Sequence, residues 1–425
     1  MTFAIHTFGC KVNIYESEYV TNLLLTHGYQ MLDFNSDKEA DIYLINTCTV
    51  TNEADKKDRK LIHTTRNNHK NSILIVMGCY SQLNPETIDA DIVIGNKYKS
   101  HIINLINEFK INHQKITKVN DITKTDFEDM YISRFLTHTR AFVKIQDGCN
   151  AFCAYCTIPY ARGGIRSKDF DKVINEVTNL VNNGYKEIVL TGIHTGRYGI
   201  EKHTNLEKLL RELVKIPNIF RIRLSSIEIN EITDGIIDLI KNNDIMAKHL
   251  HIPLQSGSNQ ILKSMNRLYD TSTFINRVAD IRKEIPDISI TTDLIVGFPG
   301  ETDELFQETL DTLNKIKFTK IHTFPYSRRS GTKADAMPNQ VDGNIKKCRV
   351  KEVLNLSDKY ELAFYKQKIG NTYNGIIETR KDGKKIVITS NYIPVEVSTN
   401  LKNNHEVTIK LHTVNESEIK GEIIK

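Results

Sequence analysis

Short apolar runs alternate with amphipathic stretches along the first 110 residues of the chain. The runs are FAIHTF (3–8), DIYLIN (41–46), ILIVMG (73–78) and DIVIG (91–95). Apolar strands that alternate with helical segments are typical of a parallel sheet covered by helices. We therefore expect residues 1–110 to form a parallel-sheet α/β domain.

A polar segment separates this domain from a second series of predicted strands. Residues 111–139 are rich in Thr, Lys, Asp and Asn, and we expect a linker that contains at most one strand. Between residues 140 and 366, six predicted strands alternate with helical stretches, which predicts a partial (β/α)6 barrel with its active site at the carboxyl ends of the strands. The strands are predicted at 141–146, 187–192, 220–226, 249–255, 288–297 and 320–327, and helices at 171–183, 303–316 and about 342–366.

The remaining residues, 367–425, have a third pattern, in which short strands are joined by turns. The strands are NGIIETR, KIVITSNYIPVEV, VTIKLHTV and IKGEII, with a turn at Lys381–Lys385. This predicts a small all-β barrel, a fold that commonly binds oligonucleotides. Its candidate phosphate contacts are Lys368, Arg380, Lys381, Lys384, Lys385 and Lys410.

The composition of the chain indicates the cellular compartment and the kinds of partner to expect. No apolar run approaches the roughly 20 residues of a membrane helix, and the N-terminus MTFAIHTFGC lacks the features of a secretion signal. We expect a soluble cytoplasmic protein with no membrane partner. In that reducing compartment, seven cysteines more often bind metal than form disulfides. The net charge of +5 permits an acidic partner without requiring one.

The strongest chemical signal is GCNAFCAYC, which places Cys149, Cys153 and Cys156 directly after the first strand of the second domain. Three thiolates can bind a 4Fe-4S cluster and leave one iron open for a substrate. Zinc is the alternative. A structural zinc site needs four protein ligands, however, and no second cysteine pair follows.

Three more cysteines, Cys10, Cys48 and Cys79, each follow an apolar strand of the first domain. The carboxyl ends of parallel strands meet at one edge of a sheet, so these three thiols are expected to share a second cluster. The plain alternative is that each is a small buried apolar residue. Cys348 has no cysteine near it in sequence, and we expect a structural role for it.

The CxxxCxxC motif resembles that of radical S-adenosylmethionine (SAM) enzymes, in which Tyr155 would pack near the adenine of SAM. With the domain order, the segments FGCKVNIYES, NTCTVTNEAD, QDGCNAFCAYCTIPYARG and DLIVGFPGET resemble the methylthiotransferase family over essentially the whole chain. The resemblance implies two 4Fe-4S clusters, a C-terminal barrel of the TRAM type that binds the macromolecular substrate, and two uses of SAM. One SAM is a source of the 5′-deoxyadenosyl radical, and another donates a methyl group to the inserted sulfur.

Polar residues near the ends of the predicted barrel strands are further candidates for binding SAM or substrate, although such positions are often polar only because they are solvated. They are Thr191, Gly192, Ser226, Glu228, Gln255 and Asp293, with Gly297 and Glu301. Arg162 and Arg166, after the cysteine loop, are expected either to pair with a phosphate or substrate carboxylate or to lie in a solvated loop.

Within the family, the resemblance favours the branch that acts on N6-threonylcarbamoyladenosine at position 37 of tRNA. Lys11 lies in CKVN, where the isopentenyladenosine branch typically has CQMN, and Asp147 lies in IQDGC. Lys11 could pair with the substrate carboxylate, tune the cluster or be solvated. Expected partners are the tRNA anticodon stem-loop, an electron donor such as flavodoxin or ferredoxin, and a sulfur source. The alternatives are isopentenyladenosine, a ribosomal protein side chain, or a non-catalytic iron-sulfur protein that binds RNA.

Overall fold

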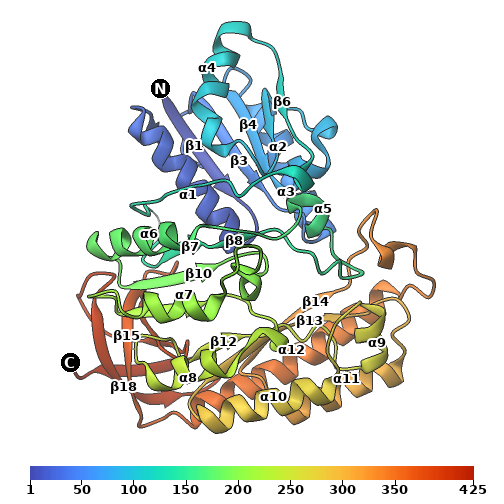
Figure 1. The fold of residues 1–425 in the computed structure, drawn as a ribbon, viewed down its shortest axis with the longest axis vertical. Coiled ribbons are helices and arrows are strands. Elements are labelled where there is room, and N and C mark those ends of the chain that lie inside the picture. The colour runs from blue at the N-terminus through green and yellow to red at the C-terminus, as the bar shows by residue number, and fades with distance from the viewer. Residues whose placement is uncertain (137) are drawn as a thin grey trace.

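Three groups of strands organise the computed structural model, which describes residues 1–136 and 138–425. Figure 1 shows an N-terminal domain, a barrel of β/α units below it, and a small β-barrel that follows in the chain. Thr137, in the predicted linker, lies outside the described residues. No helix in the described part of the chain is long and apolar enough to cross a membrane.

The N-terminal domain is a parallel sheet in the order β2-β1-β3-β4-β5-β6. The last strand, β6, is the one strand expected in the linker. The strands are β1 (Thr2–Thr7), β2 (Gln30–Met31), β3 (Ile42–Thr47), β4 (Ile73–Gly78), β5 (Ile92–Ile94) and β6 (Ile116–Lys118). The helices are α1 (Lys11–Thr26), α2 (Asn52–Asn68), α3 (Cys79–Leu83) and α4 (Ile102–Asn112).

Strand β4 and residues 42–45 of β3 are apolar because both faces of this sheet are covered. Along β3, Ile42 and Leu44 pack with α1 and α4 on one face, whereas Tyr43 and Ile45 pack with Ile62 of α2 on the other. Alternate residues of a strand point to opposite faces, so a continuous apolar run is what a two-sided core requires.

The second domain consists of two parallel half-sheets, β11-β10-β7 and β12-β13-β14. Parallel bridges between Ile222 and Met246 and between Ser226 and His251 connect them into a partial barrel. The strands are β7 (Ala141–Lys144), β10 (Glu187–Thr191), β11 (Arg221–Leu224), β12 (His249–His251), β13 (Ser289–Val296) and β14 (Lys320–Pro325), with a separate pair β8 (Gln146–Asp147) and β9 (Arg166–Ser167). The helices are α5 (Ile158–Arg162), α6 (Phe170–Asn182), α7 (Leu206–Leu213), α8 (Asp234–Asn242), α9 (Asn259–Ser264), α10 (Thr271–Glu284) and α11 (Asp303–Ile316).

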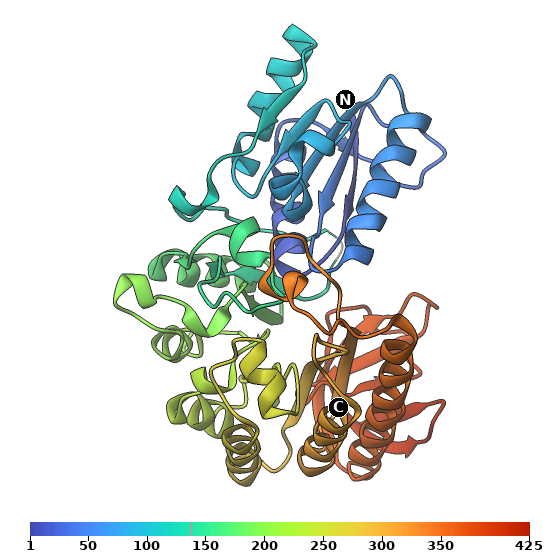
Figure 2. The ribbon, with the colours of Figure 1, turned by 90° about the vertical axis from the view of Figure 1, so that its right-hand side faces the viewer.

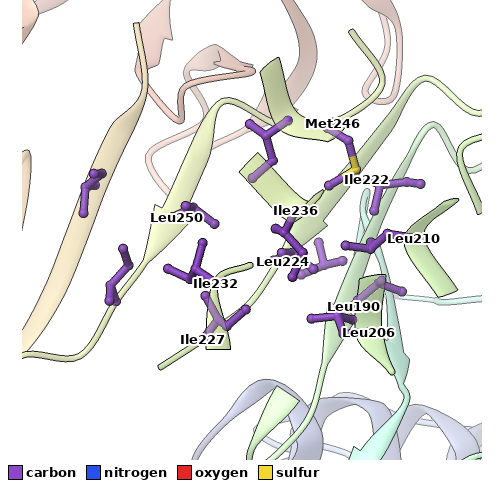
Figure 3. Close-up of a cluster of buried hydrophobic side chains, with 14 of the residues drawn as sticks. Leu190, Leu206, Leu210, Ile222, Leu224, Ile227, Ile232, Ile236, Met246 and Leu250 are labelled. Carbon is purple, nitrogen blue, oxygen red and sulfur yellow. The ribbon is translucent and has the colours of Figure 1, made fainter. Parts of the chain in front are cut away.

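The barrel helices are held by an apolar core between helix and strand. Figure 3 shows Leu206 and Leu210 of α7 beside Leu190 of β10, and Ile236 of α8 beside Leu224 of β11. Leu206 and Leu210 are four positions apart and therefore lie on one face of their helix. This packing holds the strands in place, so that their carboxyl ends can present polar side chains.

The long helix α12 (Gly343–Lys366) packs against β14 and leads into the C-terminal barrel. That barrel is closed in the order β15-β16-β17-β19-β18, around a core that includes Ile377, Val387 and Ile409. Its strands are β15 (Thr372–Thr379), β16 (Lys385–Thr389), β17 (Pro394–Glu396), β18 (Glu406–Val414) and β19 (Ile419–Ile423). The predicted fold class, an α/β chain with a parallel-sheet domain, a partial barrel and a C-terminal all-β barrel, is confirmed.

The C-terminal barrel is fastened to the second domain by two buried arginines of β11. Arg221 donates to the backbone carbonyls of Asn374 at 2.8 Å and Ile388 at 3.0 Å. Arg223 donates to those of Thr389 and Ser390, both at 3.2 Å. Both arginines share the fully buried Glu187 as a counter-ion, so the buried charges at this junction are paired.

Candidate active site

The CxxxCxxC loop lies between β8 and α5 and is held by a glycine turn. Gly148 has φ +75°, and a Cβ there would lie 1.9 Å from the carbonyl oxygen of Gly164, so only glycine fits. The Cys149 N–H donates to the carbonyl of Gly163 at 2.9 Å, and the Cys156 N–H donates to that of Cys153 at 2.9 Å. The loop thus presents three thiols from one short, braced segment.

Donors surround these three thiols. The Ile158 N–H points at Cys156 Sγ at 3.4 Å, and Arg267 Nη1 points at Cys153 Sγ at 3.4 Å. Burial raises the pKa of Cys156 to about 12, and the neighbouring Cys153 adds to the effect. A bound metal has the opposite effect on the pKa of a thiol, because a metal cation deprotonates its thiol ligands. Donors aimed at sulfur are suited to thiolates that ligate a cluster.

The other three cysteines meet at the carboxyl edge of the N-terminal sheet. Cys10 precedes α1 and is exposed, Cys48 follows β3, and Cys79 begins α3. A Cβ added at Gly9 would lie 2.9 Å from Cys48 Sγ, so the Cys10 loop packs directly on Cys48. Burial, and next the neighbouring Cys79, raise the pKa of Cys48 to about 12. The structure thus brings together residues that are 38 and 31 positions apart in the sequence.

Both sets suit a cluster better than a closed four-ligand zinc site, because each consists of three thiols. In the residues that the structure describes, no three Cys, His, Asp or Glu side chains lie close enough to hold a single metal ion. A 4Fe-4S cluster is bound differently, since each thiolate ligates a separate iron. Cys348 is exposed on α12, away from both sets.

Arg162 joins the two cysteine regions through a buried network. It is fully buried, and its Nε donates to Cys79 Sγ at 3.2 Å. Its Nη1 donates to Glu16 at 2.9 Å and to Asp147 at 3.1 Å, and its Nη2 donates to Asn13 at 2.7 Å. The sequence-based expectation of a phosphate partner or a solvated loop was wrong, because the chain itself saturates this guanidinium group.

The same network fixes the charge of Glu16 in α1. Lys144 lies 2.7 Å and Lys99 lies 3.3 Å from its carboxylate, in addition to Arg162. Burial opposes ionisation, but the three cations outweigh it and hold the pKa of Glu16 well below its usual range. One carboxylate of the N-terminal domain therefore pairs with two cations of the second domain, Lys144 and Arg162.

Three other sequence-based expectations are corrected by the structure. Arg166 donates to the backbone carbonyls of Ile122 and Thr125, so it braces the linker. Glu301 is buried, accepts from the Gly297 N–H at 2.7 Å and pairs with Arg349, which gives it a structural role. Lys368 is buried against Asp287 and is not available to a phosphate.

A cavity of about 790 Å³, here called the central cavity, lies between the three domains. Four of the predicted ligand-binding residues line it, and so do residues from α1 and the loop before it, among them a cysteine and a lysine. The first group comprises Thr191, Gly192, Ser226 and Asp293, and the second includes Cys10 and Lys11. Its lining therefore combines the carboxyl ends of the barrel strands with the edge of the N-terminal sheet.

Tyr155, Glu228 and Gln255 do not line the central cavity. Glu228 forms an ion pair with Arg267, whose other nitrogen contacts Cys153. Glu228 thus positions an arginine at the cysteine loop. Burial raises the pKa of Tyr155, and the charge of Arg267 opposes this rise. Gln255 has φ +64°, and its backbone pairs with β13 next to Asp293.

Two residues beside the site had not been predicted from the sequence. His194 Nδ1 lies 3.3 Å from Cys149 Sγ, and its Nε2 lies 2.8 Å from Glu231. Tyr392, from the turn between β16 and β17, reaches the central cavity and packs against His249, with the ring planes tilted by 34° and the centroids 4.8 Å apart. His194 lies in the TGIHTG segment, which could have suggested it. No local pattern marks Tyr392, because its role depends on domain docking.

The loop that follows β14 connects the barrel to the N-terminal domain on a second side. Figure 2 shows this orange segment at the boundary between the two domains. Arg329 lies 2.7 Å from Asp55 of α2 and donates to the side chain of Asn52 at 2.7 Å. The central cavity is therefore bordered by domains that are fastened to one another at several points.

Comparison with known proteins relates this architecture to characterised enzymes. The radical SAM superfamily model matches residues 143–313, and the model described as uncharacterized protein family UPF0004 matches residues 2–95. A threonylcarbamoyladenosine tRNA methylthiotransferase from Bacillus subtilis is 43% identical over 93% of this chain and 90% of its own length. One from Thermotoga maritima is 40% identical over 87% and 85%. A tRNA-2-methylthio-N6-dimethylallyladenosine synthase from Acetivibrio thermocellus is 35% identical over 90% and 80%.

Among solved structures, the chain resembles a radical S-adenosylmethionine methyltransferase, TsrM, from Kitasatospora setae. The TM-score is 0.58 at 14% identity, and the match covers 76% of this chain and 72% of that protein. At this identity the likeness concerns the fold alone. It supports the arrangement of a parallel-sheet domain above a partial barrel.

Proposed function

Because the chain belongs to the methylthiotransferase family of radical SAM enzymes, we propose that it converts N6-threonylcarbamoyladenosine at position 37 of tRNA to its 2-methylthio derivative. The observation that carries the proposal is the near full-length match to bacterial enzymes whose names specify this nucleoside. The three relatives of this name from Bacillus subtilis, Thermotoga maritima and Aquifex aeolicus are 37–43% identical, whereas the dimethylallyladenosine synthase from Acetivibrio thermocellus is 35% identical.

In this proposal the two cysteine sets have different tasks. Cys149, Cys153 and Cys156 hold the cluster that binds SAM, and Cys10, Cys48 and Cys79 hold the cluster at which sulfur is supplied. When bound, these groups supply the electron that cleaves SAM to a 5′-deoxyadenosyl radical and the sulfur that is transferred. The central cavity, which Cys10 lines together with the ends of the barrel strands, receives the adenosine.

The chain's own residues orient these components and exclude water. Arg267, held by Glu228, places a positive charge at Cys153, while Arg162 places another at Cys79. Asp293 faces the central cavity from β13 and lies 3.2 Å from His251 Nε2, so it can accept a hydrogen bond from a ligand hydroxyl or ammonium group. Fixed polar groups of this kind act without reorganisation during reaction.

The partners follow from the reaction. The RNA is recognised as an anticodon stem-loop, the reduction needs a donor such as flavodoxin or ferredoxin, and each turnover consumes one sulfur atom from an external source. All three are available in the cytoplasm, where we place the protein.

The proposal is tested with reconstituted enzyme. Anaerobically loaded protein is incubated with SAM, sulfide, dithionite and an anticodon stem-loop that carries N6-threonylcarbamoyladenosine, and the digested RNA is examined by mass spectrometry. A mass gain equal to one methylthio group in place of hydrogen, with release of 5′-deoxyadenosine, supports the proposal. Turnover of an isopentenyladenosine stem-loop only would transfer the chain to the other branch. Absence of 5′-deoxyadenosine release from fully loaded protein would exclude a radical SAM enzyme.

A further inference from the structure

Lys11, the first residue of α1, lines the central cavity next to the cluster ligand proposed at Cys10. Three other residues of the same lining are Arg140, Arg223 and Tyr392. Arg140 and Arg223 come from the barrel and Tyr392 from the C-terminal domain. All three domains therefore contribute to one wall of the central cavity, and the first two supply its basic residues.

The two arginines of this wall already have counter-ions. Arg140 Nε lies 2.8 Å from Glu378, and Arg223 Nε lies 2.8 Å from the buried Glu187. Both also contact Tyr392, whose hydroxyl lies 3.4 Å from Arg140 Nη1 and whose ring lies 4.6 Å from the Arg223 guanidinium carbon. They are consequently fixed in place.

Lys11 differs from them, because no carboxylate within the described ranges comes within 4 Å of its ammonium group and no acceptor binds it. The acidic groups of the cavity lining are engaged elsewhere. Asp293 pairs with His251, and Glu361 pairs with Lys320 at 2.6 Å. An ammonium group in a recessed site without a counter-ion is unfavourable until an anion arrives.

We propose that Lys11 binds the carboxylate of the threonylcarbamoyl group and so selects this nucleoside over an apolar N6 substituent. The inference rests on the proposed function and deepens it. An ammonium group is a compact point charge, and it can follow a flexible carboxylate without a fixed bidentate geometry. An isopentenyl group offers no partner, so its entry leaves the lysine desolvated and unpaired. A site built for a charged group rejects such an analogue strongly.

The position of Lys11 also suits the chemistry. The N6 substituent is attached at C6 of adenine, and C6 and C2 flank the same ring nitrogen, N1. Because Lys11 follows Cys10 directly, a nucleoside held by its N6 substituent is brought to the sheet edge where the second cysteine set lies. Recognition of the nucleoside and sulfur transfer thus depend on adjacent residues at the start of α1.

The test measures binding to cluster-loaded protein with three stem-loop RNAs that differ at one adenosine. The first carries N6-threonylcarbamoyladenosine, the second its neutral carboxamide, and the third isopentenyladenosine. The wild-type protein is expected to prefer the carboxylate to the carboxamide by roughly 10- to 100-fold, the usual value of a hydrogen bond to a charged group. Lys11→Met is expected to abolish this preference, and Lys11→Arg to retain most of it. Lys38→Met, at an exposed lysine of the same domain, is the matched control.

Each outcome either supports or overturns the role of Lys11 in binding the carboxylate. Equal affinity of the wild-type protein for carboxylate and carboxamide would overturn the role of Lys11 without any variant, as would an unchanged preference in Lys11→Met. Iron content measured on every sample shows whether the neighbouring Cys10 still ligates its cluster. If the wild-type protein does not methylthiolate the first RNA at all, the proposed function fails, whereas turnover without charge preference removes only the role of Lys11.

Discussion

Nε of Arg162 donates a hydrogen bond to Sγ of Cys79 at 3.2 Å, across the boundary between the barrel and the N-terminal domain. Arg162 follows the CxxxCxxC loop by six residues and is anchored by Glu16 and Asp147. One cation therefore connects the segment that carries the first cysteine set to a cysteine of the second. Positive charge and hydrogen bonds at cysteine sulfur tune the reduction potential of a cluster.

The first prediction is that Arg162→Gln makes the reduction potential of the N-terminal cluster more negative. The substitution removes a cation and a hydrogen bond, and both favour the reduced, more negatively charged cluster. The potential is measured by titration with electron paramagnetic resonance in a Cys149→Ala, Cys153→Ala, Cys156→Ala background, where only this cluster remains. Arg211→Gln, at an exposed arginine of α7, is the control. An unchanged reduction potential in protein whose remaining cluster is fully loaded with iron would contradict the prediction.

The second prediction is that the two cysteine sets lose iron independently. Replacing Cys149, Cys153 and Cys156 with Ala is expected to remove about half the iron and to abolish SAM cleavage, because the two sets lie in different domains. Replacing Cys10, Cys48 and Cys79 is expected to remove the other half and to preserve SAM cleavage while sulfur insertion is abolished. Iron, sulfide and 5′-deoxyadenosine are measured per chain. Full iron content in the second triple variant would refute the assignment.

The third prediction concerns Glu187, the buried counter-ion beneath the C-terminal barrel. Burial opposes its ionisation, but Arg223 and Arg221 outweigh it and lower the pKa of Glu187 to about 2. A lowered pKa in the folded state means that this stability is present above the ordinary value of 4.5 and is lost as the pH falls toward 2. Glu187→Gln is expected to reduce the free energy of unfolding at pH 7 by about 3–5 kcal/mol.

Urea unfolding as a function of pH checks this prediction. The difference between wild type and Glu187→Gln is expected to shrink as the pH falls from 4.5 toward 2. Glu207→Gln is the control, since Glu207 pairs with Arg211 near the surface, where an ion pair contributes about 0–1 kcal/mol. A difference that does not change with pH would show that Glu187 is not ionised in the folded protein.

The fourth prediction concerns tRNA affinity and the exposed basic residues of the C-terminal barrel. Lys381 is exposed at the hairpin between β15 and β16, and Lys385, partly exposed at the start of β16, donates to Asn403 at 2.9 Å. Lys381→Gln with Lys385→Gln is expected to weaken tRNA binding and to lower the slope of log affinity against log salt by roughly 0.7–0.9 for each phosphate that is no longer neutralised. Lys38→Gln is the control. An unchanged slope would mean that this hairpin does not bind RNA.

Substitutions are the appropriate test here, because removal of residues 367–425 would have a second effect. It would leave Arg221 and Arg223 without the backbone carbonyls that they bind in the C-terminal barrel. Their ion pairs with Glu187 would remain, but the junction would lose these hydrogen bonds and its cover, which changes the stability of the second domain directly. A truncated protein would therefore confuse weaker RNA binding with lower stability of the fold.

Much of the fold could be predicted because each element depends on local pattern. The apolar run 73–78 is β4 (Ile73–Gly78), and the helical stretch 303–316 is α11 (Asp303–Ile316). The two cysteine sets could be predicted for a related reason. Cys48 and Cys79 follow their strands directly and Cys10 follows β1 by three residues, and parallel topology brings such positions to one edge.

What could not be predicted depends on how the domains dock. Nothing near Arg162 in sequence indicates that its partners are Glu16 and Cys79, which lie 146 and 83 positions away. Lys368 was expected to bind phosphate because it is a lysine in a polar tail, but Asp287 of another domain neutralises it. Tyr392 reaches the central cavity only because the C-terminal barrel sits against β11.

The central claim is that this chain methylthiolates N6-threonylcarbamoyladenosine in tRNA, and the most direct measurement is the nucleoside content of bulk tRNA from cells that lack the gene. We expect 2-methylthio-N6-threonylcarbamoyladenosine to disappear, its unmethylthiolated precursor to accumulate, and 2-methylthio-isopentenyladenosine to be unchanged. Wild-type protein is expected to restore the missing nucleoside, whereas Cys79→Ala protein is not. Loss of the isopentenyl product with the threonylcarbamoyl product intact would contradict this claim.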